Sequence, residues 1–193
     1  MPLSPVPIGK TGLAKPSGGS ATFGIPDTQF GISINTTTLT INEVRYVPFR
    51  SFYGRILTAV AVEVQAGPAS NANLRIGLYA ADFDNQPIGA PIYDSGNIAV
   101  ASGFSGVKSL TGLAVPLPPG RYVSCVNCDV AMALRTYYGP TSFLSSGLGA
   151  GAFFARGSVA QTYGAFPNPG TVWTTATFGT NPLQNIVFWQ WTE

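Results

Sequence analysis

Two cysteines, Cys125 and Cys128, have a spacing that could support metal or redox chemistry. A zinc site needs two further thiolate or imidazole ligands, and this 193-residue sequence has no other cysteine and no histidine. A redox pair needs a helix N-terminus to stabilise its thiolate, whereas the residues around this pair alternate like β-strands. We therefore expect two packed thiols beside a turn, with no bound metal and no cofactor.

A turn-rich segment contains Asp82, Asp84 and Asn85, whose side-chain oxygens could begin a calcium loop. A calcium loop of the helical type also needs a late bidentate glutamate, and the next glutamate after Glu63 is Glu193. The alternative is a turn in which Asp and Asn side chains bond their own backbone. The sequence favours the turn and leaves calcium binding at Asp82 and Asp84 open.

Catalytic groups are scarce in this chain. The absence of histidine excludes nucleophilic pairs of the Ser-His and Cys-His kinds. A glycosidase needs two carboxyl groups at a set separation, and the few carboxylates lie mostly near turns. The sequence predicts a protein that is not an enzyme and has no catalytic residues.

A region rich in glycine, serine and aromatic residues spans 139–182. Exposed aromatic rings stack on sugar faces or anchor protein contacts, whereas rings packed beneath a loop form a satellite core. Packing or subunit contact is favoured, and ligand recognition stays open. The side chains concerned are Phe143, Phe153, Phe154, Tyr163, Phe166 and Trp173.

The charge content of the chain is low, and its charges are dispersed. Asp, Glu, Lys and Arg make up 9% of the residues, against about 25% in soluble domains. Nucleic-acid binding requires several phosphates to be neutralised from one face, so nucleic acid is not an expected partner. No apolar run approaches the ~20 residues of a membrane span, and the early prolines do not fit a signal peptide. Such a composition favours a surface that is partly covered in an assembly.

The elements that must position these residues have the period of β-strands. In the stretch 73–80, Leu74, Ile76 and Leu78 share one parity, which predicts one buried face and one face open to solvent or to a partner. No segment of helical length has a 3.6-residue apolar period, so we expect an all-β domain, an antiparallel sandwich or jelly roll. The segments 121–126 and 131–138 are expected to form a hairpin. Strands are also predicted near 32–49, 55–64, 91–96, 98–100, 107–117 and 186–191.

The first 30 residues differ from the rest of the chain. They contain five prolines and five glycines without a usable period, so they cannot bury enough apolar surface to order themselves. The sequence predicts an extended assembly arm at 1–30 and a β-sandwich domain at 31–193. The anchors available to the arm are Leu3, Val6, Ile8, Leu13, Phe23 and Ile25.

Several short motifs occur in a particular order from residue 42 to residue 193. They are Arg45-Tyr46-Val47-Pro48-Phe49, Arg75-Ile76-Gly77-Leu78-Tyr79, the loop 82–87, Asp94-Ser95-Gly96, Pro119-Gly120-Arg121-Tyr122 and Tyr163-Gly164-Ala165-Phe166-Pro167. In this order they resemble a family of tailed-bacteriophage virion proteins. The arm at 1–30 has no counterpart in the resemblance.

The resemblance implies a jelly-roll-like domain on a tail fibre, a head fibre or a capsid surface, often as a trimer. It implies no reaction, and it carries over no functional residue because the motifs are structural. The expected partners are other virion proteins and further copies of the chain, in a particle assembled in the host cytoplasm and released by lysis. Two alternatives are a receptor-binding module that recognises a host surface glycan and a carbohydrate-binding domain from a larger enzyme.

Overall fold

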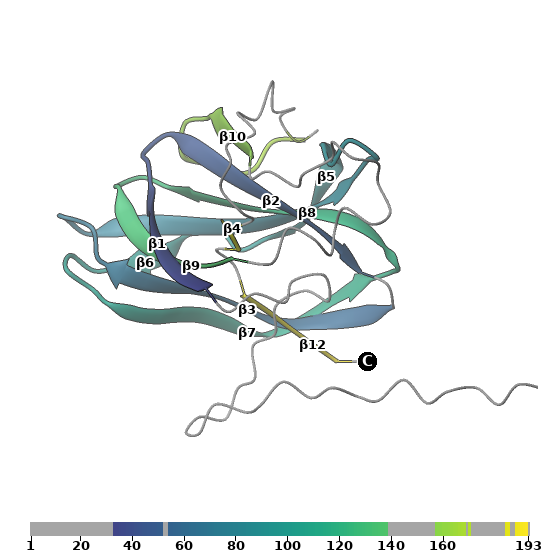
Figure 1. Cartoon of the computed structure of the whole chain (residues 1–193), viewed down its shortest axis with the longest axis horizontal. Helices are drawn as coiled ribbons and strands as arrows, with labels where there is room; N and C mark the ends of the chain where they lie inside the picture. Colours follow the sequence, from purple (N-terminus) through teal and green to yellow (C-terminus); the bar gives the residue numbers. More distant parts are fainter. Residues whose placement is uncertain are drawn as a thin grey trace, which may run out of the picture.

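The computed structural model describes residues 33–51, 54–138, 157–168, 170, 184–185 and 188–192. All regular elements within these ranges are β-strands, and they form two antiparallel sheets packed as a sandwich (Figure 1). The prediction of an all-β antiparallel sandwich is therefore confirmed. Across the described ranges there is no helix whose length and apolar character would suit a bilayer crossing. The six arm anchors lie outside the described residues.

The first sheet has the strand order β1-β9-β3-β12, with β7 on the other side of β3 and β11 beside β9. Antiparallel pairing joins β1 to β9 along its whole length, from Ser33 opposite Tyr138 to Leu39 opposite Met132. The strands of this sheet are β1 (Ser33–Leu39), β3 (Arg55–Ala66), β7 (Gly106–Leu117), β9 (Met132–Tyr138), β11 (Gln184–Asn185) and β12 (Phe188–Thr192).

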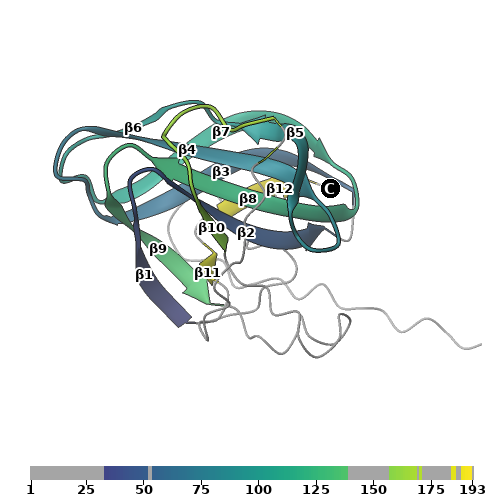
Figure 2. The same cartoon turned by 90° about the horizontal axis from the view of Figure 1, so that it is seen from above.

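The second sheet has the strand order β10-β2-β8-β4-β5, with β6 also paired to β4. Seen from above, β10 lies beside β2 at one edge and β5 lies at the other (Figure 2). The strands of this sheet are β2 (Glu43–Ser51), β4 (Ala72–Ala81), β5 (Pro87–Asp94), β6 (Ile98–Val100), β8 (Gly120–Cys128) and β10 (Gly157–Ala160).

The pairing of the strands is nested. The inner pair is β4 with β5, and the pairs β3 with β7, β2 with β8 and β1 with β9 enclose it in turn. Successive pairs lie in alternate sheets, so the chain passes between the layers from β1 to β2, from β2 to β3 and from β3 to β4.

The predicted hairpin between 121–126 and 131–138 is wrong. The two segments are β8 and β9, which belong to different sheets. The turn between them is held instead by Asp129, whose carboxylate accepts hydrogen bonds from the backbone N–H and the side-chain amide of Asn73, both at 2.7 Å. Strand periodicity and turn residues locate a change of direction, but they do not say in which sheet the next strand pairs.

The main core lies between the two sheets and uses the parity predicted for 73–80. Its centre is fully buried and includes Leu74, Ile76 and Leu78 of β4 and Val60, Val62 and Val64 of β3. Burying each such side chain contributes about 1.5–3 kcal/mol. The opposite face of β4 is also covered, and a later part of the chain covers it.

Candidate functional site

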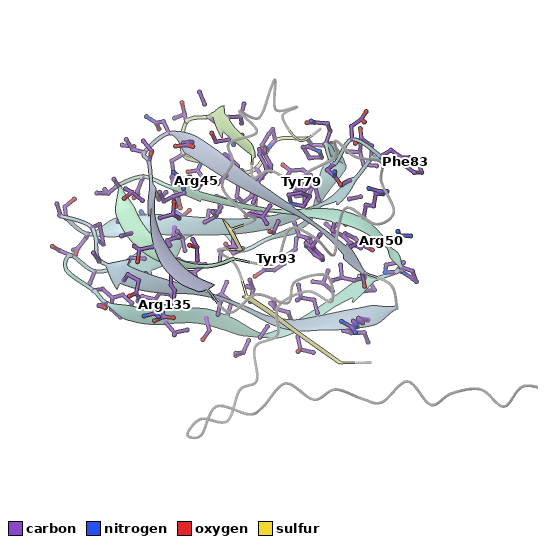
Figure 3. The ribbon with its side chains drawn as sticks, viewed as in Figure 1. Arg45, Arg50, Tyr79, Phe83, Tyr93 and Arg135 are labelled. Carbon is purple, nitrogen blue, oxygen red and sulfur yellow. The ribbon has the colours of Figure 1, made fainter. Side chains whose placement is uncertain are left out.

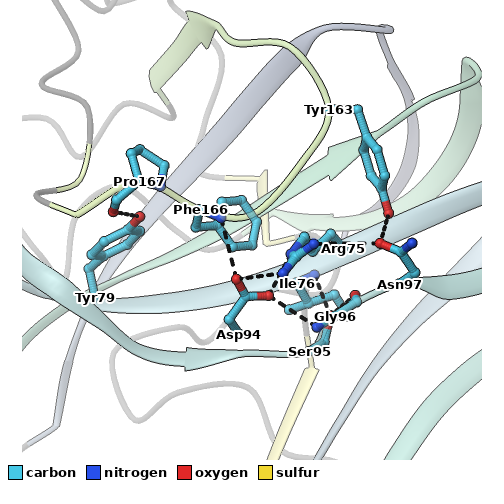
Figure 4. A network of polar contacts seen from close by, with 10 residues as sticks. All are labelled: Arg75, Ile76, Tyr79, Asp94, Ser95, Gly96, Asn97, Tyr163, Phe166 and Pro167. Carbon is cyan, nitrogen blue, oxygen red and sulfur yellow. Dashed lines mark hydrogen bonds and ion pairs between the residues drawn. The ribbon is translucent and has the colours of Figure 1, made fainter.

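A second apolar cluster lies on the outer face of the second sheet. Its members are Val44, Tyr46, Tyr79, Val123, Cys125 and Phe166. Phe166 reaches the cluster from residues 161–168, a segment after β10 that we call the strap (Figure 4). Burial raises the pKa of both tyrosine hydroxyls in this cluster well above the ordinary value. The strap therefore gives the sandwich a small third layer.

Phe166 occupies the space left by a glycine in the middle of a strand. The register places Tyr46, Cys125, Gly77 and Asp94 side by side across β2, β8, β4 and β5. A Cβ atom on Gly77 would lie 2.6 Å from the Phe166 ring and 2.6 Å from the Cys125 sulfur. Glycine within a strand often marks a close approach of another group, and here that group is the strap.

An ion pair beside this contact connects β4, β5 and the strap. Arg75 of β4 binds Asp94 of β5 through two hydrogen bonds, Nε to Oδ1 at 2.6 Å and Nη2 to Oδ2 at 3.0 Å. The same carboxylate accepts the backbone N–H of Gly96 at 3.0 Å and that of Phe166 at 3.3 Å (Figure 4). The pair thus fastens the strap to both strands.

Further hydrogen bonds hold the strap at either end. Near its start, the Tyr163 hydroxyl donates to Asn97 Oδ1 at 2.9 Å, and its backbone N–H donates to Asn42 Oδ1 at 3.3 Å. Near its end, the Tyr79 hydroxyl donates to the Pro167 carbonyl at 2.7 Å. These contacts span the outer face from the β1–β2 turn to β5, so they fix the path of the strap.

Two of the six aromatic residues singled out in region 139–182 lie on the strap. Phe166 is buried and Tyr163 is partly buried, so both contribute to packing within the chain. The remaining residues Phe143, Phe153, Phe154 and Trp173 lie outside the described ranges. Arg75, Gly77 and Asp94 occur in the sequence motifs given above, where they had no role in a site, although a glycine inside an apolar strand was a usable signal.

Tyr163 should make the stability of the fold depend on alkaline pH. Burial, followed by the negative charge of Asp129, raises the pKa of Tyr163 from 10.0 to about 12. The folded state therefore favours the neutral phenol, whose contribution is complete below pH 10 and is lost as the pH rises towards 12. We expect the free energy of unfolding of the Tyr163→Phe variant to fall less steeply across that interval than that of the parent. Equal slopes in urea titrations at several pH values would contradict this.

The two cysteines lie three residues apart on one strand, β8, and so face opposite sides of the sheet. Cys125 belongs to the outer cluster and Cys128 to the main core, and both are free and buried. The pKa of Cys128 is raised to about 12, and that of Cys125 lies well above its ordinary value. Burial is the main cause of both shifts. Thiols with this environment are unreactive, because the thiolate is the nucleophile.

We expect neither thiol to react with an aromatic disulfide reagent at neutral pH while the chain is folded. In denaturant, both should react at once. The Cys125→Ser, Cys128→Ser double variant should contain as little zinc as the parent. One equivalent of zinc per chain that is lost in the double variant would contradict the packed-thiol interpretation.

The segment that could have begun a calcium loop forms the β4–β5 turn. Asp82 Oδ1 accepts the backbone N–H groups of Asp84 at 2.9 Å and of Gln86 at 2.8 Å. Asn85 has a φ of 61°, a left-handed conformation that Asn tolerates better than most residues. The segment is therefore the turn that the sequence favoured, in which an Asp side chain bonds the backbone of the same turn.

No protein-family model matches this sequence, and no curated protein matches it. The contacts described above all lie within the chain, and they hold the strap against the outer face of the second sheet. The residues that make them are Arg75, Asp94, Tyr163 and Phe166.

Proposed function

We propose that this chain is a structural component of a bacteriophage particle and that its sandwich is a jelly roll. It would serve as a capsid-decoration, head-fibre or tail-fibre protein. The observation that carries this proposal is the nested pairing of β1 with β9, β2 with β8, β3 with β7 and β4 with β5. Folding of one long hairpin across two layers gives this pattern, and such jelly rolls are common in viral capsid proteins and lectins.

The positions of the sequence motifs support the same proposal. The segments 75–79, 94–96 and 163–167, which resemble motifs of phage virion proteins, meet in one network (Figure 4). Their residues bond to one another, as expected for motifs that specify a fold. A charged fraction of only 9% is also suited to a surface that is covered in an assembly.

We further propose that residues 1–30 attach the domain to the particle and that the domain is an oligomer, with a trimer favoured. Fixing a backbone costs ~1–2 kcal/mol per residue. Larger apolar residues are few among the 30 residues of the arm, so contacts outside the domain must supply the energy that orders it. Attachment through the arm would leave the two sheets free to face outward.

The test is sedimentation with particles released from cells that carry the gene. The full chain should co-migrate with the particles in a density gradient. A chain that starts at Gly31 should fold with the same melting temperature and remain in the soluble fractions. If both chains stay soluble, the virion proposal is wrong. If both co-migrate, the particle contacts lie on the sandwich and the arm is dispensable.

A receptor-binding module for a host surface glycan is the second candidate. One observation favours it, namely the exposed ring of Phe83, which contacts the guanidinium of Arg121 and is labelled at the same end of the molecule as Arg50 in Figure 3. Particle copy number separates the two, since decoration of a capsid needs many copies and a tail fibre needs few.

A further inference from the structure

Phe83 lies at the tip of the β4–β5 turn and is 84% exposed, more than any other large hydrophobic residue in the described ranges. The turn beneath it is well defined, because the Asp82 side chain bonds the backbone N–H groups of two neighbours. A ring held on such a turn loses little conformational entropy when it binds. Because the Phe83 ring is so exposed, it contributes little to the packing of the sandwich.

Two arginines lie at the same end of the second sheet. Arg50 of β2 and Arg121 of β8 are directly opposite each other in the register, on the face away from the main core. The neighbouring pair, Phe49 and Tyr122, stacks inward with ring centroids 5.6 Å apart. This register places two guanidinium groups on the same part of the outer face.

The surroundings of Arg121 differ from those of Arg45, Arg75 and Arg135. Its guanidinium lies 5.0 Å from the centre of the Phe83 ring, and its Nη1 is 3.5 Å from the amide oxygen of Asn85. Both partners are neutral, and Oδ1 of Asp82 accepts two backbone N–H groups of its own turn. Three other arginines in the described ranges pair with carboxylates: Arg45 with Glu43, Arg75 with Asp94, and Arg135 with Glu63.

We propose that Phe83, Arg121 and Arg50 form a binding site for an acidic sugar of a surface glycan. The apolar face of the sugar would stack on the Phe83 ring. Its carboxylate or phosphate oxygens would accept charge-assisted hydrogen bonds from the guanidinium groups, whose fork matches both anions. This site goes beyond the structural role proposed above and does not depend on where the chain sits in a particle.

The experiment measures binding of the full chain to four probes by calorimetry at low ionic strength. The probes are galacturonate trisaccharide, a phosphorylated trisaccharide, neutral galactotriose and polyglycerol phosphate, which has the anion without a ring. We expect an acidic trisaccharide to bind more tightly than both galactotriose and polyglycerol phosphate. Whichever acidic trisaccharide binds more tightly identifies the anion as carboxylate or phosphate.

Variants assign the binding to the proposed site. Arg121→Gln should weaken binding roughly ten- to hundredfold, because a hydrogen bond to a charged group is lost. Phe83→Ser should weaken it roughly three- to tenfold through loss of stacking, and Arg50→Gln should also weaken it. Lys108→Gln is the matched control, since it removes one positive charge from a second cation–ring pair, with Phe104, and should leave the affinity unchanged.

Three results would each overturn the proposal. They are absence of binding of both acidic trisaccharides at millimolar concentration, equal affinity for galactotriose, and equal effects of Arg121→Gln and Lys108→Gln. Melting temperatures check that each variant is folded, and amide shifts of Asn85 in the parent protein report binding even if one variant misfolds. A negative result would leave the sedimentation test of the structural role unaffected.

Discussion

Replacing Gly77 by alanine is expected to lower the free energy of unfolding by about 1–3 kcal/mol, the usual cost of overpacking a filled core. The added Cβ would lie 2.6 Å from the Phe166 ring and from the Cys125 sulfur. Cys125 lies in β8, which is paired on both sides, whereas Phe166 belongs to the strap. The strap should therefore move while the core between the sheets stays intact. Thermal unfolding and hydrogen exchange of the Phe166 amide measure the two effects.

Gly164 supplies the matched control for this substitution. It also lies in the strap, but a Cβ atom there would meet no other atom within 4 Å, and its φ is not in the left-handed region. Gly164→Ala should therefore leave the melting temperature and the exchange of the Phe166 amide unchanged. Equal effects of Gly77→Ala and Gly164→Ala would mean that the strap does not pack on β4 in the way described.

Replacing Asp94 by alanine should destabilise the chain by about 2–3 kcal/mol. The change removes the acceptor for Arg75, Gly96 and Phe166 together. Breaking a fully buried ion pair costs about 3–5 kcal/mol. This pair should cost less, because the side chains of Arg75 and Asp94 are 17% and 20% exposed to solvent. Urea unfolding gives the free energy directly.

The reverse substitution, Arg75→Ala, should cost less than Asp94→Ala. The carboxylate would keep the two backbone N–H donors of Gly96 and Phe166, whereas Asp94→Ala leaves the guanidinium without its charged partner. The double variant should be less destabilised than the sum of the single variants, because the two residues interact directly. A larger loss from Arg75→Ala would show that Asp94 does not bind the strap.

Local patterns in the sequence were sufficient for most of the strands. The alternation at 73–80 placed Leu74, Ile76 and Leu78 on one buried face, and the Asp- and Asn-rich segment 82–86 gave the turn that follows. Both features depend only on neighbouring residues, through the period of the strand and the side-chain bonds of the turn.

The strap and its partners could not be predicted in the same way. Phe166 and Asp94 are 72 residues apart along the chain, and no local period relates them. The expectation that one face of β4 is open to solvent or to a partner is wrong, because the strap of the same chain covers that face at Gly77 and Tyr79. The hairpin error has the same origin, because the sheet in which β9 pairs is decided by its distant partners β1 and β3.

Immunoelectron microscopy of purified particles tests the proposed structural role most directly. Antibodies against the recombinant chain should label particles at fixed positions, either across the capsid surface for a decoration protein or along a fibre for a head- or tail-fibre protein. Particles from cells in which the gene is deleted should not be labelled. Unlabelled particles, together with antigen that remains in the soluble fraction of the lysate, would contradict the proposal.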